Sequence, residues 1–130
     1  MGMDFDIINE CKSLSLKGQI TFPEVVAKLA SIGVERYIID LVGLKGLYYS
    51  VKNESYLSDF DFNPLPISQR FDIETIKNTI ADIQQELINY QTFLQRIIES
   101  GCSHYEVYIT GRKVIYFGRD GSHHIELFPS

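Results

Sequence analysis

Apolar side chains recur at helical spacing in four stretches of the chain. The clearest stretch follows Asp72, where isoleucines three or four positions apart form one apolar stripe: Ile73, Ile76, Ile80 and Ile83. Earlier in the chain, Thr21 and Glu24 have the spacing of a capping box, and Gly33 stands where a left-handed C-cap ends a helix. The predicted helices cover residues 4–14, 21–33, 72–83 and 89–101.

After each pair of helices, apolar and polar residues alternate with a period of two, which is typical of β-strands. The alternation is clearest in two runs of β-branched and aromatic residues: Tyr37, Ile39 and Leu41, and Tyr105, Val107 and Ile109. Turn residues follow at Asn53 and Gly121, and both residue types tolerate a positive φ. The predicted strands cover residues 36–42, 47–51, 55–57, 104–110, 114–118 and 122–128.

The second half of the chain repeats the first at a shift of 68 residues, because residues 20–53 align on residues 88–121 without a gap. Six aligned pairs are identical: Ile20/Ile88, Gly33/Gly101, Tyr37/Tyr105, Gly43/Gly111, Lys45/Lys113 and Tyr48/Tyr116. We predict an α+β fold that duplicates a helix-helix-strand-strand-strand unit, with an antiparallel sheet and the helices on one face. Repeat 1 covers about 4–57, repeat 2 about 71–128, and a proline-containing linker, 58–70, joins them. Whether the repeats share one sheet stays open.

Strand alternation also predicts which side chains share a face of the sheet. We assign to the core Tyr105 and the residues that continue its pattern: Val107, Ile109, Ile115, Phe117, Ile125 and Leu127. The opposite face then carries Glu106, Tyr108, Val114, Tyr116, His124, Glu126 and Phe128 in repeat 2, and Ile38, Asp40, Val42, Tyr48 and Tyr56 in repeat 1. A three-residue turn at 119–121 places Tyr116 opposite His124, and Val114 opposite Glu126.

This opposite face is too aromatic for open solvent and too acidic for a sealed core. Its candidate ligand or interface residues are Asp40, Tyr48, Glu106, Tyr108, Tyr116, His124 and Glu126. We favour a non-enzymatic protein that contacts a second copy or another protein there, because large aromatic patches are usually covered. The alternatives are a small-molecule or active site around Tyr116, where His124 and Glu126 offer acid–base chemistry, and an exposed face without a role. No catalytic residue is assigned.

Length, charge and cysteine content narrow the class of protein. A chain of 130 residues predicts a single domain, and a net charge of −5 disfavours nucleic-acid binding, which depends on Lys and Arg. Two cysteines without a CxxC pair predict the reducing cytoplasm, and no apolar run reaches the ~20 residues of a membrane helix. Cys102, His104 and Glu106 alternate on a strand but have no second ligand pair, so we expect no metal and no cofactor.

Two long stretches resemble a known bacterial family. They are GQITFPEVVAKLASIGVERY at Gly18–Tyr37 and GRKVIYFGRDGSHHIELFP at Gly111–Pro129. Both resemble the YbcV-like family of unknown function, whose members often carry the label "phage envelope protein". The resemblance extends over nearly the whole chain. It implies a bacterial origin but no activity, cofactor or catalytic residue, and helix caps, core and a hairpin explain both stretches.

Overall fold

Within residues 3–129, the part of the chain that the structure describes, four helices form close to where the apolar spacing predicts them. The computed structural model places α1 (Phe5–Leu16), α2 (Phe22–Ser31), α3 (Ile73–Gln84) and α4 (Tyr90–Glu99). Each helix follows a residue whose side chain accepts hydrogen bonds from the first backbone N–H groups: Asp4, Thr21, Asp72 and Asn89. Thr21 and Glu24 form the complete capping box that their spacing predicts.

The strands of the described chain join one antiparallel sheet. They are β1 (Val34–Asp40), β2 (Lys45–Ser50), β3 (Ser55–Asp59), β4 (Cys102–Tyr108), β5 (Lys113–Gly118) and β6 (His123–Leu127). Their order across the sheet is β3-β2-β1-β4-β5-β6, so the two repeats meet where β1 pairs with β4. The predicted α+β fold is confirmed, and both repeats share a single sheet.

The backbone repeats at the shift that the sequence predicts. Each helix and strand of the second half begins and ends 68 residues after its counterpart in the first half. The left-handed backbone conformations repeat as well, as pairs of residues with positive φ: Gly18/Glu86, Gly33/Gly101, Leu44/Arg112 and Asn53/Gly121. The paired residues Ile38 and Glu106 are equivalent under the same shift, so a pseudo-two-fold axis passes between them at the centre of the sheet.

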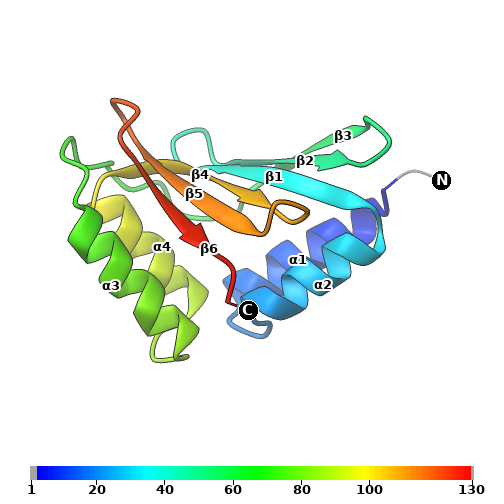
Figure 1. Cartoon of the computed structure of the whole chain (residues 1–130), viewed down its shortest axis with the longest axis horizontal. Helices are drawn as coiled ribbons and strands as arrows, with labels where there is room; N and C mark the ends of the chain where they lie inside the picture. Colours follow the sequence, from blue (N-terminus) through cyan, green and yellow to red (C-terminus); the bar gives the residue numbers. More distant parts are fainter. Residues whose placement is uncertain (1–2, 130) are drawn as a thin grey trace.

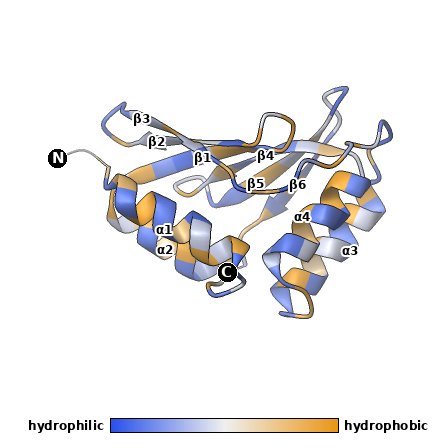
Figure 2. Ribbon diagram, turned by 180° about the vertical axis from the view of Figure 1, so that it is seen from behind, coloured by the Kyte–Doolittle hydropathy of each residue, from blue (hydrophilic) through white to orange (hydrophobic). Residues whose placement is uncertain are grey.

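The helices form one layer and the sheet forms another. The α1–α2 pair and the α3–α4 pair lie side by side on the same face of the sheet, and the other face carries no helix of the described chain (Figure 1, and from behind Figure 2). The most buried large side chains lie between the layers and come from both repeats: Ile8, Leu29, Ile39, Leu41, Ile76, Leu94, Ile97, Ile98 and Val107. None of the described helices is long and apolar enough to cross a membrane.

Candidate functional site

The predicted face assignment is wrong for β2, β3, β5 and β6. Tyr116 lies opposite Tyr105, and Tyr48 lies opposite Tyr37, so all four point toward the helices. The cause is turn length: residues 109–112 connect β4 to β5, and this even number of residues puts odd-numbered positions opposite even-numbered ones. Four residues assigned to the core lie instead on the open face, which is the face of the sheet that carries no described helix: Ile115, Phe117, Ile125 and Leu127.

The seven candidate residues are consequently divided between the two faces of the sheet. Three lie on the open face, Asp40, Glu106 and Tyr108, and four face the helices, Tyr48, Tyr116, His124 and Glu126. Tyr56 and Val114 face the helices as well, whereas Val42 lies in the turn after β1 and is exposed. The predicted pairings of Tyr116 with His124 and of Val114 with Glu126 are confirmed.

A row of mostly aliphatic side chains crosses the open face from one edge strand to the other. The members of this open-face row occupy paired positions on neighbouring strands: Leu57, Leu47, Ile38, Glu106, Ile115 and Ile125. Leu57 and Ile125, at the two ends, are 60% and 46% exposed. Glu106, at the centre, is the charged member. Because no described helix covers this face, the row presents apolar surface to water (Figure 1).

Polar side chains flank the open-face row with balanced charge. The Tyr108 hydroxyl donates a hydrogen bond to the Glu106 carboxylate, and this bond raises the pKa of Tyr108. The Arg36 guanidinium lies 3.7 Å from the ring centroid of Tyr49. Asp40 accepts a hydrogen bond of 2.9 Å from the backbone two residues later, so it stabilises a turn. At the paired positions of this face, three basic residues stand against three acidic ones: Lys45, Arg36 and Lys113, and Asp59, Asp40 and Glu106.

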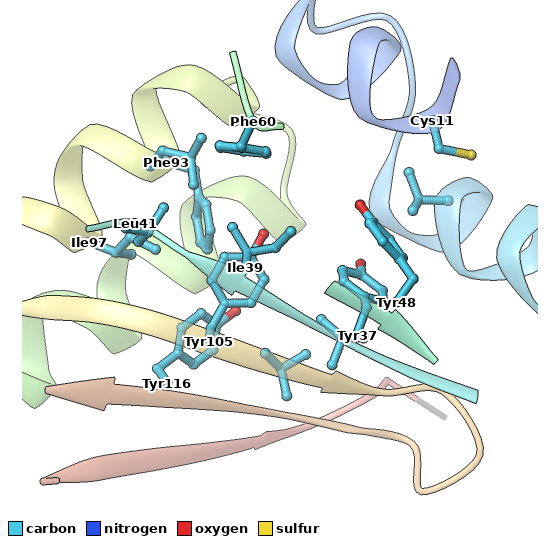
Figure 3. Packing of buried hydrophobic residues seen from close by; sticks show 14 of the residues in the cluster. Cys11, Tyr37, Ile39, Leu41, Tyr48, Phe60, Phe93, Ile97, Tyr105 and Tyr116 are labelled. Atoms are coloured by element: carbon cyan, nitrogen blue, oxygen red, sulfur yellow. The ribbon is translucent and has the colours of Figure 1, made fainter. Parts of the chain in front are cut away.

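On the other face, the central strands carry a group of buried tyrosines (Figure 3). This tyrosine cluster consists of Tyr37, Tyr48, Tyr105 and Tyr116 from the sheet and Tyr90 from α4. The four sheet members are 4–6% exposed. Burial raises the pKa of all five tyrosines well above the usual value. At neutral pH they are therefore uncharged hydroxyl groups, suited to hydrogen bonding and not to nucleophilic attack.

His124 and Glu126 form the contact that their strand spacing predicts. Nε2 of His124 lies 3.0 Å from Oε1 of Glu126, and the two side chains are 17% and 32% exposed. The pair lies on the edge strand β6, beside the buried Tyr116. In this arrangement the carboxylate orients the imidazole ring.

The two cysteines are not activated nucleophiles. Burial raises the pKa of Cys102 to about 12, and its Sγ donates to the backbone carbonyl of His104 at 3.3 Å. Burial also raises the pKa of Cys11. A β-bulge between Cys102 and His104 interrupts the alternation that would place them on one face. In the described part of the chain, no three His, Cys, Asp or Glu residues are grouped so as to hold a metal ion.

Sequence reasoning missed a cavity between the tyrosine cluster and the helices α1 and α2. Its volume is about 50 Å³, and its lining includes Cys11, Lys12, Phe22, Val25, Tyr37 and Tyr48. These residues belong to four elements, so no local pattern reveals the cavity. The sequence holds one signal of the cavity, which is a difference in side chain between aligned positions of the two repeats. Phe22 corresponds to Tyr90, and Val25 corresponds to Phe93.

A larger and shallower hollow lies between the linker and α4. Its volume is about 470 Å³, and it is lined by Asp61, Phe62, Asn63, Leu65, Gln91 and Gln95. None of the seven candidate residues belongs to this lining. The hollow therefore does not bring the candidate residues together.

A comparison with models of protein families assigns the chain to one family. The model of a family described as "Protein of unknown function (DUF1398)" matches residues 53–126, which is more than half of the chain. The chain belongs to this family. No curated protein matches it. In this DUF1398 chain the matched segment contains β3, the linker and nearly all of repeat 2, while the cavity residues of α1, α2, β1 and β2 precede it.

Proposed function

We propose that the protein is non-enzymatic and self-associates through the open face of its sheet. The open-face row carries this proposal, because its aliphatic side chains form a band across six strands that no described helix covers. Exposed apolar surface of this kind is typical of protein–protein contacts. Aliphatic residues take the role that we expected of Tyr48 and Tyr116, since those tyrosines face the helices.

A second copy is the partner that the charges favour. The paired positions of this face, with Glu106 of the row included, hold three basic and three acidic side chains, although the chain as a whole has a net charge of −5. A balanced face meets its own copy without strong like-charge repulsion, whereas a highly charged partner would be matched by a face of one sign. The open-face row is likewise complementary to a second apolar row.

Glu106 limits the expected strength of this contact. It interrupts the open-face row at its centre, and a carboxylate loses hydration when a partner excludes water. The hydrogen bond from Tyr108 offsets only part of that loss. We therefore expect a dimer that dissociates on dilution.

Sedimentation velocity over a range of protein concentrations tests the proposal. We expect the wild type to change from monomer to dimer as concentration rises, and the double variant L57E/I125E to stay monomeric. Leu87→Glu is the matched control, because Leu87 lies in the turn between α3 and α4 and is 67% exposed, compared with 60% for Leu57. A wild type that is monomeric at about 1 mM contradicts the proposal, as does a dimer that the double variant leaves intact.

A small-molecule or active site around Tyr116, His124 and Glu126 is the second candidate. The contact of 3.0 Å between His124 and Glu126 favours it. Native mass spectrometry compared with the denatured mass tests this candidate. A bound mass that disappears on denaturation and is absent from the His124→Ala variant would favour it over self-association. A mass equal to a whole multiple of the chain mass would exclude a tightly bound ligand.

We further propose that the protein is a cytoplasmic bacterial protein that does not bind nucleic acid. The support comes from the sequence: the YbcV-like resemblance, two cysteines without a CxxC pair, and a net charge of −5. The YbcV-like name and its phage label stay predictions. A binding assay with single-stranded nucleic acid at low salt checks the last point, since binding there would contradict the proposal.

A further inference from the structure

Equivalent tyrosines in the two repeats differ in how the protein satisfies their hydroxyl groups. In repeat 2 the hydroxyls of Tyr105 and Tyr90 are hydrogen-bonded to each other. The equivalent positions in repeat 1 are Tyr37 and Phe22, so the second ring has no hydroxyl to offer. Within residues 3–129, the tyrosines whose hydroxyls form hydrogen bonds are Tyr56, Tyr90, Tyr105 and Tyr108. Neither Tyr37 nor its neighbour Tyr48 is among them.

Tyr37 and Tyr48 both line the cavity. The two residues are only 5% and 4% exposed. No side-chain oxygen or nitrogen of the described chain is completely enclosed without a partner, so each of these two hydroxyls keeps some surface that a water molecule can reach. Figure 3 shows both side chains pointing from the sheet toward the helix that carries Cys11.

The cavity lies where repeat 1 has a smaller side chain than repeat 2. Val25 lines the cavity, and its equivalent in repeat 2 is Phe93, whose ring packs edge-on against Tyr116 with centroids 6.2 Å apart. Phe22 is 40% exposed and packs against Phe128, at 5.5 Å between ring centroids. The smaller valine and the outward position of Phe22 together leave the room that aromatic rings fill in repeat 2.

We propose that this cavity binds a small uncharged molecule whose carbonyl or hydroxyl oxygen accepts hydrogen bonds from Tyr37 and Tyr48. Lys12 contributes the charged side chain of the lining, and its ammonium is held by the Ser58 hydroxyl and the Asp59 carbonyl. The Asp59 carboxylate is paired with Lys45 and attracts Lys12 more weakly, so two uncharged oxygens already hold the Lys12 ammonium. A cation would lose its hydration there without a counter-charge, and an anion would have to draw the Lys12 ammonium away from the two oxygens that hold it.

The volume limits the part of the ligand that is buried. One water molecule needs about 10–15 Å³ of such space, so about 50 Å³ accommodates a group the size of an amide or a short ketone. Any further part of the ligand would leave on the side of Phe22, where the lining reaches the surface. The structure therefore assigns to the site a small polar group at its inner end, hydrogen-bonded by two tyrosines.

Titration of the labelled protein with acetamide and with acetate, followed by nuclear magnetic resonance, tests the proposal. The two probes have the same shape and differ in charge. We expect saturable shifts around the cavity with acetamide, and at least about tenfold weaker binding of acetate. Tyr37→Phe and Tyr48→Phe should each weaken acetamide binding about fivefold, because each removes one hydrogen bond and keeps the ring. Tyr49→Phe is the matched control, because Tyr49 lies on the open face of β2, the strand that carries Tyr48, and this variant should bind acetamide normally.

Three results would overturn the proposal. They are the absence of saturable acetamide binding up to about 1 M, acetate binding as tight as acetamide binding, and unchanged affinity in the double variant Y37F/Y48F. Val25→Phe gives an independent check, since it places in the cavity the ring that repeat 2 has at the equivalent position. It should abolish acetamide binding. If this larger side chain disrupts the fold, the phenylalanine variants still decide the question, because they add no volume.

Discussion

The two repeats share a backbone path but attach their helices to the sheet differently. In repeat 1, Asn9 of α1 donates a hydrogen bond to the Tyr56 hydroxyl at 2.9 Å and accepts one from Ser58 at 2.7 Å, which ties α1 to the edge strand β3. The positions equivalent to Tyr56 and Ser58 in repeat 2 are His124 and Glu126, which bind each other instead. The contact that looks most like an active-site pair thus stands where repeat 1 has a structural attachment.

Comparing the two repeats shows which features they share and which differ between them. Backbone conformation is fixed, since residues with positive φ occur at equivalent positions in both repeats. Side chains between the layers vary: Phe22 corresponds to Tyr90, and Val25 corresponds to Phe93. Repeat 2 consequently has a hydroxyl pair, formed by Tyr90 and Tyr105, and this pair borders a cavity whose other lining comes mostly from repeat 1. Differences of this kind mark where a duplicated fold has room for a specific role.

Alkaline pH is expected to have the largest effect on stability. A tyrosine is neutral when protonated, and burial raises the pKa of all five members of the tyrosine cluster above the value of about 10 in an unfolded chain. Above pH ~10 the unfolded chain releases these protons while the folded chain keeps them. Each tyrosine then lowers the free energy of unfolding by about 1.4 kcal/mol per pH unit, or about 7 kcal/mol for five. Stability is retained below pH ~10 and lost within about two units above it.

The repeats contribute unequally to this pH dependence, with two of the five tyrosines in repeat 1 and three in repeat 2. The double variant Y37F/Y48F should keep about three-fifths of the slope and unfold at a higher pH. Circular dichroism and tyrosinate absorbance, recorded on the same samples, measure both quantities. Tyrosine ionisation that runs to completion before the fold is lost would show that the cluster is open to solvent.

Alanine at the two equivalent glycines that follow the C-caps of α2 and α4, Gly33 and Gly101, should give the next largest effect. Gly33 and Gly101 have φ values of +88° and +93°, a conformation that costs alanine about 1–2 kcal/mol. A Cβ at Gly101 would lie 2.2 Å from the backbone oxygen of Arg70, whereas a Cβ at Gly33 would meet a methyl group of Val51 at 3.9 Å. We expect Gly101→Ala to lower the free energy of unfolding by more than about 3 kcal/mol, and Gly33→Ala by about 1–2 kcal/mol.

Urea unfolding of the two alanine variants measures this difference directly, with each variant as the control for the other. The backbone conformation is the same at both positions, so the difference isolates the contact with the linker. Equal losses would mean that the linker moves aside at Arg70, and the two repeats would then be equivalent at their C-caps.

The elements and the duplication were predictable because their signals are local. A capping side chain such as Thr21 or Asp72 acts within three residues, and strand alternation needs only neighbouring positions. The register of Tyr116 with His124 was also predictable, since a short turn at 119–121 sets it. Local rules therefore predict the helices, the strands and the pairing of two strands joined by a short turn.

The faces of β2 and β5 were not predictable from the same rules. Gly43 and Gly111 lie in the turns before these strands, yet the left-handed residues there are Leu44 and Arg112, with φ of 54° and 55°. Non-glycine residues adopt this conformation infrequently, so the four-residue turn is not apparent from the sequence. The cavity was even less predictable, because it depends on how α1 and α2 pack on a sheet face whose residues were assigned incorrectly.

The smallest expected effect concerns the hydroxyl pair of repeat 2. Tyr90→Phe removes the partner of the buried Tyr105 hydroxyl and should cost about 1–3 kcal/mol of unfolding free energy. Tyr37→Phe removes a hydroxyl without a hydrogen-bond partner in the described chain, and should cost less than about 0.5 kcal/mol. Urea unfolding at neutral pH, without added small molecules, compares the two. Equal costs would mean that the Tyr37 hydroxyl is as firmly hydrogen-bonded as that of Tyr105, and the difference between the repeats would then lie in side-chain volume at Val25 and Phe93 alone.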